Sequence, residues 1–169
     1  DSFGAYPGDF WLVKTNSSGN MQWSKRYGGT KNDMAESVIQ TSDGGYALVG
    51  MTLSSGAGGY DFWLVKTDSS GNMQWSKTYG GAHDDEAHSV IQTSDGGYAL
   101  IGPTDSFGAG EDYWLVKTDS AGNLQWSKTY AGEWADQPWS IVETGDKGYV
   151  IGGWSDSFPR GDFNFCLVK

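Results

Sequence analysis

Residues 61–66, with the sequence DFWLVK, decide the fold because this block returns at a fixed interval along the chain. The same block stands at 9–14, returns as DYWLVK at 112–117, and recurs in the degraded form NFCLVK at 164–169. Counted at the lysine that ends each block, the steps are 52, 51 and 52 residues. Self-similarity at a fixed period of this length indicates a repeat architecture.

Three other blocks keep the same order and interval. They are QWSK at 22–25, 74–77 and 125–128; SVIQT at 37–41 and 89–93, with SIVET at 140–144; and YALVG at 46–50, with YALIG at 98–102 and YVIGG at 149–153. Turn sequences separate the blocks, such as Asp43-Gly44-Gly45 between the first and the second, and Asp-Gly is a strong hairpin signal. Each repeat therefore predicts four strands, and no stretch shows a helical period.

The predicted strands differ in a way that indicates their arrangement. Residues 62–65 and 98–101 are apolar on both faces, so each must have a packing partner on either side. Residues 73–79 alternate instead, with Met, Trp, Lys and Tyr on one face, as expected for an outer, half-wet strand. Four-stranded antiparallel sheets stacked face to face describe the blades of a β-propeller. A parallel β-helix is the competing geometry, although its coils are shorter and need no Asp-Gly hairpin in every repeat.

The ordered blocks resemble the bacterial and archaeal β-propeller repeat family. The resemblance rests on the strand ending in YALVG, the DFWLVK strand, and the Ser-Gly-Asn-x-Gln-Trp-Ser-Lys segment, and it extends over the whole chain. It implies an all-β fold of propeller blades in a secreted or surface-displayed protein. It implies no particular activity, because one fold hosts many functions.

The repeat divides residues 1–169 into one array. The expected units are a partial blade at 1–29, blades at 30–81 and 82–132, and a second partial blade at 133–169. Since a propeller closes with 4–8 blades, this array cannot close alone. We expect a segment of a longer protein, with an assembly of copies that share strands as the alternative; the expected partners are other blades of the same protein or copies of itself.

Composition excludes several classes of partner. The formal charge is −10, from 21 acidic and 11 basic residues, which repels nucleic acid and anionic lipid. No apolar run approaches the roughly 20 residues of a membrane span. Aromatic residues make up 15% of the chain, which argues against disorder, and a single cysteine permits no internal disulfide.

One acidic position recurs in every repeat, as Asp33, Asp85 and Asp136, and the middle copy adds Asp84 and Glu86. These carboxylates could bind a cation such as Ca²⁺ at one mouth of a ring. The alternative is that each aspartate caps the turn into its strand by accepting backbone N–H bonds. Because the pattern lacks the ligand density of a dedicated calcium loop, capping is the favoured interpretation and no cofactor is expected.

Three tryptophans belong only to the last copy: Trp134, Trp139 and Trp154. Aromatic residues that the repeat does not require could form a sugar-stacking site, whereas divergent packing in the last repeat is the plainer explanation. The tryptophans that do recur, Trp23, Trp75 and Trp126, are expected to anchor one blade on the next.

No nucleophile–base arrangement, phosphate-binding loop or pair of catalytic carboxylates stands out, so the sequence predicts no enzyme. We expect a non-enzymatic structural or interaction module that is extracellular or displayed at the cell surface, with carbohydrate or other ligand binding through loop aromatics as the alternative. Asn16-Ser17-Ser18 fits the acceptor pattern for N-glycosylation, which is short enough to occur by chance.

Overall fold

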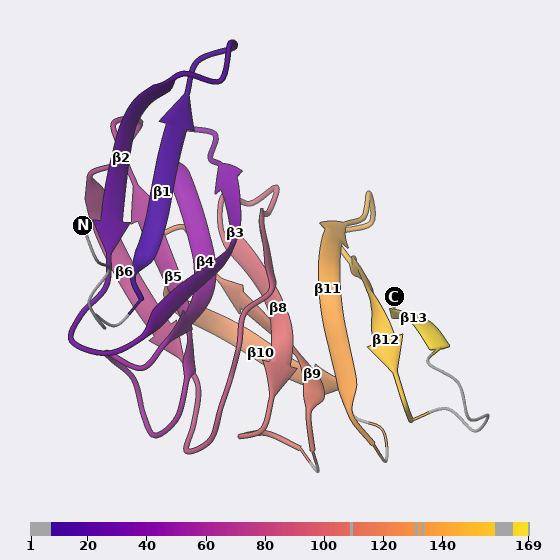
Figure 1. The fold of residues 1–169 in the computed structure, drawn as a ribbon. Helices are drawn as coiled ribbons and strands as arrows, with labels where there is room; N and C mark the ends of the chain where they lie inside the picture. The colour runs from indigo at the N-terminus through magenta and orange to yellow at the C-terminus, as the bar shows by residue number, and fades with distance from the viewer. Residues whose placement is uncertain (1–7, 109, 131, 133, 158–163, 169) are drawn as a thin grey trace.

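The computed structural model describes residues 8–108, 110–130, 132, 134–157 and 164–168, the last five by their backbone alone. In this part of the chain the fold is all-β, with thirteen strands and no helix, and hence no helix of the length and apolarity that would cross a membrane. The strands form four separate antiparallel sheets that follow one another in chain order (Figure 1). These sheets do not close into a barrel or ring within the described residues.

Each of the two middle sheets has four strands arranged in sequence order. The second sheet is β3 (Asp33–Gln40), β4 (Tyr46–Thr52), β5 (Asp61–Thr67) and β6 (Met73–Tyr79); the third is β7 (Ser89–Gln92), β8 (Tyr98–Thr104), β9 (Asp112–Thr118) and β10 (Leu124–Tyr130). The first sheet has β1 (Phe10–Thr15) and β2 (Met21–Tyr27), and the fourth has β11 (Asp136–Glu143), β12 (Tyr149–Ser155) and β13 (Asn164–Val168). The prediction of repeated four-stranded antiparallel sheets is confirmed.

The first strand of the repeat departs from the prediction at its beginning. Strand β3 starts at Asp33, four residues before the SVIQT block, because a β-bulge between Ala35 and Ser37 lets the ladder with β4 continue. In the third sheet this extension shrinks to an isolated bridge between Asp85 and Thr104. The recurring aspartates Asp33, Asp85 and Asp136 thus pair with the second strand of their own repeat.

The hairpin between the first and second strands forms because Asp43 organises it. Its Oδ1 accepts the N–H of Gly45 at 3.0 Å, and Gly44 has a φ of 82°, in the left-handed region that glycine adopts at no steric cost. Asp95 and Gly96 repeat this arrangement, with a φ of 84° at Gly96. In the last copy Lys147 takes the glycine position at a φ of 67°.

The core lies between the sheets and repeats from one junction to the next. We call the side of a sheet that carries Phe62 and Leu64, or their equivalents, the Phe face, and the side that carries Trp63 and Val65, or their equivalents, the Trp face. The Phe face of the second sheet packs on Trp114 and Val116 of the third in one buried cluster. The other two junctions also place the Phe face of one sheet against the next sheet.

Outer strands add a second contact at each junction. The ring centroids of Trp23 and Tyr46 lie 5.9 Å apart and edge-on, and the same spacing recurs for Trp75 with Tyr98 and for Trp126 with Tyr149. The recurring tryptophans therefore pack one sheet on the next, which is the coarser part of their expected role. The alternation expected in 73–79 is only partly correct, because Met73, where the register shifts next to a bulge, is 52% exposed.

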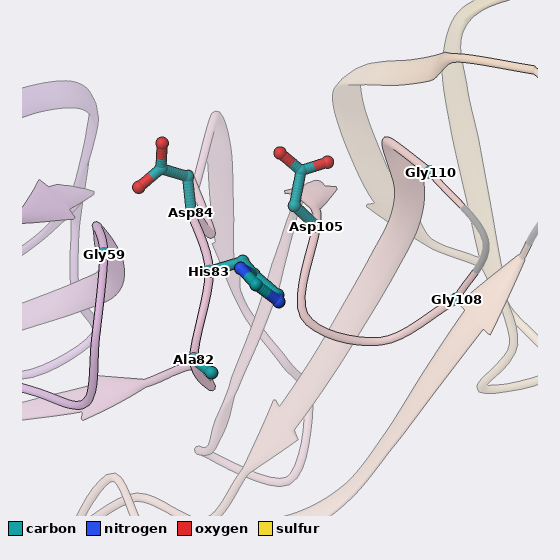
Figure 2. A pocket seen from close by; sticks show the side chains of 7 residues that line it. All are labelled: Gly59, Ala82, His83, Asp84, Asp105, Gly108 and Gly110. Carbon is teal, nitrogen blue, oxygen red and sulfur yellow. The ribbon is translucent and has the colours of Figure 1, made fainter.

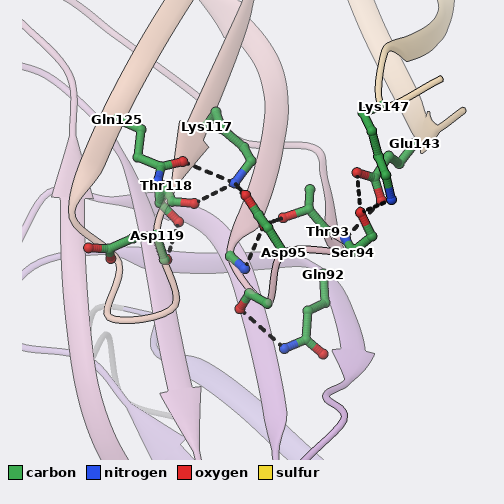
Figure 3. Close-up of polar contacts among 12 residues, drawn as sticks. Gln92, Thr93, Ser94, Asp95, Lys117, Thr118, Asp119, Gln125, Glu143 and Lys147 are labelled. Carbon is green, nitrogen blue, oxygen red and sulfur yellow. Dashed lines mark hydrogen bonds and ion pairs between the residues drawn. The ribbon is translucent and has the colours of Figure 1, made fainter.

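A buried lysine ties the third strand to the first hairpin of the same repeat. Lys117 donates to Asp95 Oδ2 at 2.9 Å, to the Thr118 carbonyl at 2.8 Å and to Gln125 Oε1 at 3.1 Å (Figure 3). Lys66 makes the same set of bonds in the second sheet. Beside this network, the Ser94 N–H donates to Glu143 of the fourth sheet at 2.8 Å, so polar bonds also join neighbouring repeats.

Candidate functional site

The recurring aspartate is a buried acceptor within its own repeat. Asp33 Oδ2 accepts the N–H of Gly29 at 2.9 Å and the hydroxyl of Ser54 at 2.8 Å, while Oδ1 accepts the hydroxyl of Thr52. Asp85 makes the equivalent bonds with Gly81, Ser106 and Thr104. Both carboxylates are almost fully buried, so these partners replace their water.

Asp136 keeps only part of this arrangement. Its Oδ2 accepts the Gly132 N–H at 3.0 Å and the Ser157 hydroxyl at 2.9 Å, but its Oδ1 has no hydrogen-bond partner among the described residues. Here Ser155 stands where the other copies have threonine, and its hydroxyl oxygen accepts the Ser157 N–H.

These contacts favour the capping interpretation of Asp33, Asp85 and Asp136, each of which serves a different sheet. Within the described ranges, no three histidine, cysteine or acidic side chains gather at a spacing that would hold a metal ion. The cation site stays a prediction for which this part of the chain supplies no ligand set.

Of the three tryptophans in the last copy, Trp139 has the most defined setting. Its ring stacks on that of His88, the residue before β7, with centroids 4.3 Å apart and planes 11° from parallel, while 53% of Trp139 stays exposed. His88 Nδ1 lies 2.9 Å from the Pro138 carbonyl oxygen, which fixes the imidazole against β11. The His88 imidazole thus covers one face of the Trp139 indole.

Trp134 and Trp154 lie elsewhere in the last copy. Trp134 precedes β11 and is 66% exposed, with its N–H bonded to the Ser157 hydroxyl at 3.0 Å. Trp154 is half-buried on β12, where its carbonyl accepts the Tyr113 hydroxyl at 3.2 Å. The ring that stacks on Trp139 thus belongs to His88 of the preceding repeat. The sugar-stacking site stays a prediction.

A hollow lies elsewhere, mostly in the middle copy. It has a volume of about 620 Å³ and is lined by Asp84, Asp105, His83 and the backbone around Gly59 and Gly108 (Figure 2). Figure 2 shows the carboxylates of Asp84 and Asp105 projecting toward the same side.

A smaller recess next to this hollow adds two more acids, Glu86 and Glu111. Burial raises the pKa of Glu86, and the neighbouring carboxylates, Asp84 and Glu111 foremost, raise it further. The pKa of Asp105 is raised by burial and then by Glu111 and Asp84. The neighbouring carboxylates therefore disfavour the ionisation of Glu86 and Asp105.

Only two of these four acids were noted from the sequence. At three of the four positions the neighbouring copies have no acid; the equivalents in the first copy are Asn32, Met34 and Tyr60. Asp105 differs, because the last copy also has an aspartate at its position, Asp156. Departure of one copy from its neighbours is therefore a signal for Asp84, Glu86 and Glu111 alone.

Fold and sites together define an all-β protein of repeated antiparallel sheets that pack face to face. Among models of known protein families none matches this chain, and no curated protein is similar to it in sequence.

Proposed function

We propose that the chain is part of a β-propeller repeat array that acts as a non-enzymatic structural or interaction module outside the cell. One observation carries the proposal: the first sheet exposes a face that is buried in the second and third sheets. Trp11 is 62% exposed, whereas its equivalents Trp63 and Trp114 are 7% and 4% exposed. Val13 is 37% exposed, whereas Val65 and Val116 are fully buried.

The fourth sheet leaves the opposite face open. Val142 occupies the position of Ile39 and Ile91, which pack into the junction that follows them, yet it is 53% exposed. Val150 is half-exposed, whereas its equivalents Ala47 and Ala99 are fully buried. Open apolar faces of this kind mark interaction sites in soluble proteins.

The two open faces are complementary. At the junction of the second and third sheets, a Phe face meets a Trp face, and the open faces are one of each kind. A further sheet of the same repeat, joined in the same chain or carried by another copy, therefore fits either end. A head-to-tail contact of this type generates rings or filaments.

The proposal is tested by the native mass of the chain, measured by light scattering at increasing concentration. We expect species heavier than the monomer and a return to the monomer in Trp11→Lys, which places a charge in the open Trp face. Trp134→Lys is the matched control, because Trp134 is equally exposed but lies before β11. Equal masses for the parent and Trp11→Lys at every concentration would refute the role of this face.

A second candidate function is carbohydrate binding, and the stack of Trp139 on His88 favours it. A half-exposed indole with a stacked imidazole on one face offers an apolar platform for a sugar ring. Polar groups are close to it: Gln137 is two residues away in the sequence, and the Glu86 carboxylate, in the segment before β7, lies 4.0 Å from the His88 imidazole. Binding to a glycan array that disappears in Trp139→Ala and persists in Trp134→Ala would assign the platform to Trp139.

A further inference from the structure

The turn between the third and fourth strands has the same design in three repeats, with an acidic or amide side chain at its first position: Asn16, Asp68 or Asp119. Asp68 Oδ1 accepts the N–H groups of Ser70 and Asn72, both at 2.8 Å. Asp68 Oδ2 accepts the side-chain amide of Asn72 at 2.9 Å. Asp119 repeats all three bonds with Ala121 and Asn123.

Asn16 accepts the two hydrogen bonds from the backbone of its turn but not the third one, from the side chain of the last turn residue. Its Oδ1 accepts the N–H groups of Ser18 and Asn20, both at 3.0 Å. The other terminal atom is an amide nitrogen, which donates hydrogen bonds and cannot accept one from Asn20 as Asp68 Oδ2 does from Asn72. The turn therefore uses the side-chain oxygen of Asn16 and needs no hydrogen bond from Nδ2.

The exchange of aspartate for asparagine has a second effect. Residues 17–18 and 69–70 are Ser-Ser in both copies, so asparagine at position 16 alone creates the triplet Asn16-Ser17-Ser18. It is the only Asn-x-Ser/Thr triplet in the sequence. Such a triplet is an acceptor for N-linked glycans where it lies on the surface of an exported protein.

The position of the turn satisfies the steric requirement for a transferase. Asn16, Ser17 and Ser18 are all exposed. A Cβ added to Gly19 would meet nothing within 4 Å, whereas one added to Gly71 in the next copy would lie 2.7 Å from Trp23. In the second copy, where a preceding sheet covers Gly71, Asp68 keeps part of its surface exposed, and Ser69 and Ser70 are exposed. The triplet at Asn16 would therefore stay accessible beside a further sheet packed on the first.

We propose that Asn16 is the attachment site of an N-linked glycan. In this transfer a bond forms between Nδ2 and the anomeric carbon of a lipid-linked sugar diphosphate, and the bond from that carbon to the diphosphate oxygen breaks. The lipid diphosphate leaves, and the amide nitrogen loses one proton to a base of the transferase. The proposal rests on the extracellular location proposed above.

The test is secretion of the full chain from a eukaryotic host, followed by intact mass before and after treatment with an amide-cleaving glycosidase. We expect a glycan mass on the parent chain that the enzyme removes, with Asp left at position 16. Asn16→Asp and Ser18→Ala should carry no glycan. Asn16→Asp is a matched control for folding, because aspartate occupies this position in the other two repeats.

Asp68→Asn is the internal positive control, since it creates Asn-Ser-Ser at the second turn. An unmodified parent chain, with or without a glycan on Asp68→Asn, would overturn the proposal, and so would a glycan that persists in Asn16→Asp. Because the chosen host exports the chain, these outcomes test the modification of Asn16 and not the natural location of the protein. The extracellular location is tested separately, by protease treatment of intact source cells and detection of the cleaved chain.

Discussion

The ammonium group of Lys117 lies 2.9 Å from Asp95 Oδ2, and the two partners differ sharply in exposure: 5% of the lysine side chain is exposed against 57% of the aspartate side chain. Lys66 and Asp43 reproduce the pair at 2.8 Å with the same asymmetry. Water can solvate Asp95 if its partner is lost, but it cannot reach Lys117. The two halves of the pair should therefore respond unequally to mutation.

We expect Asp95→Ala to lower the free energy of unfolding by about 1–3 kcal/mol, because it leaves a buried ammonium group with only neutral acceptors. Lys117→Met should cost less, since the released carboxylate turns to solvent. Urea denaturation measures both. Lys14→Met is the control, because Lys14 is half-exposed in the two-stranded first sheet and donates to the Thr15 carbonyl. Equal losses for Lys14→Met and Asp95→Ala would contradict the argument.

Acid should weaken the same network. The Thr93 hydroxyl, the Lys117 ammonium and the Gly97 N–H hold the pKa of Asp95 below its ordinary value. A carboxyl with a depressed pKa adds stability above its unfolded pKa of about 3.9, and this stability is lost as the pH falls toward the folded value. The stability difference between the parent and Asp95→Asn should be constant near neutral pH and shrink below about pH 4. A difference that does not vary with pH would exclude the pair as its source.

Glu86 should behave in the opposite way. Its pKa is raised, so the folded chain holds the proton more tightly than the unfolded chain, and stability falls as the pH rises from the unfolded toward the folded pKa. Glu86→Gln should therefore be more stable than the parent at neutral pH and lose this advantage in acid. Thermal unfolding at several pH values measures the effect. A less stable Glu86→Gln at neutral pH would show that Glu86 has a favourable partner.

Two glycines with similar backbone angles allow the cost of backbone strain to be measured apart from the cost of a packing clash. Gly19 and Gly122 have φ values of 80° and 75°, so alanine at either position costs about 1 kcal/mol in conformation. Only at Gly122 would the new Cβ meet a neighbouring sheet, 2.7 Å from Trp75. Gly122→Ala should exceed Gly19→Ala by about 1–3 kcal/mol in denaturant titrations. Equal effects would mean that Trp75 moves aside freely.

The sequence predicted the strands well because each block occurs several times and the turns between blocks are distinctive. Residues 62–65, apolar on both faces, are fully buried within β5, apart from the edge of Trp63. The bulges were not predictable from the same pattern. A bulge shifts the register by one residue without changing the apolar or polar character of the block, as at Ala35 and Ser37.

The sites were less predictable than the strands. The stack of His88 on Trp139 joins equivalent positions of two neighbouring repeats, which becomes visible only when the repeats are laid side by side. The two roles considered for Asp33 could not be separated from the sequence, because its partners Thr52 and Ser54 lie about twenty residues downstream. Tertiary placement decides such roles.

The one-way contact of Phe face on Trp face gives the chain a polarity that no single sheet has. At each described junction the Phe face of one sheet meets the Trp face of the next, so duplication or deletion of one whole unit would keep this order of faces along the array. Contacts found at one junction alone, such as the stack of His88 on Trp139, would change with the unit that carries them.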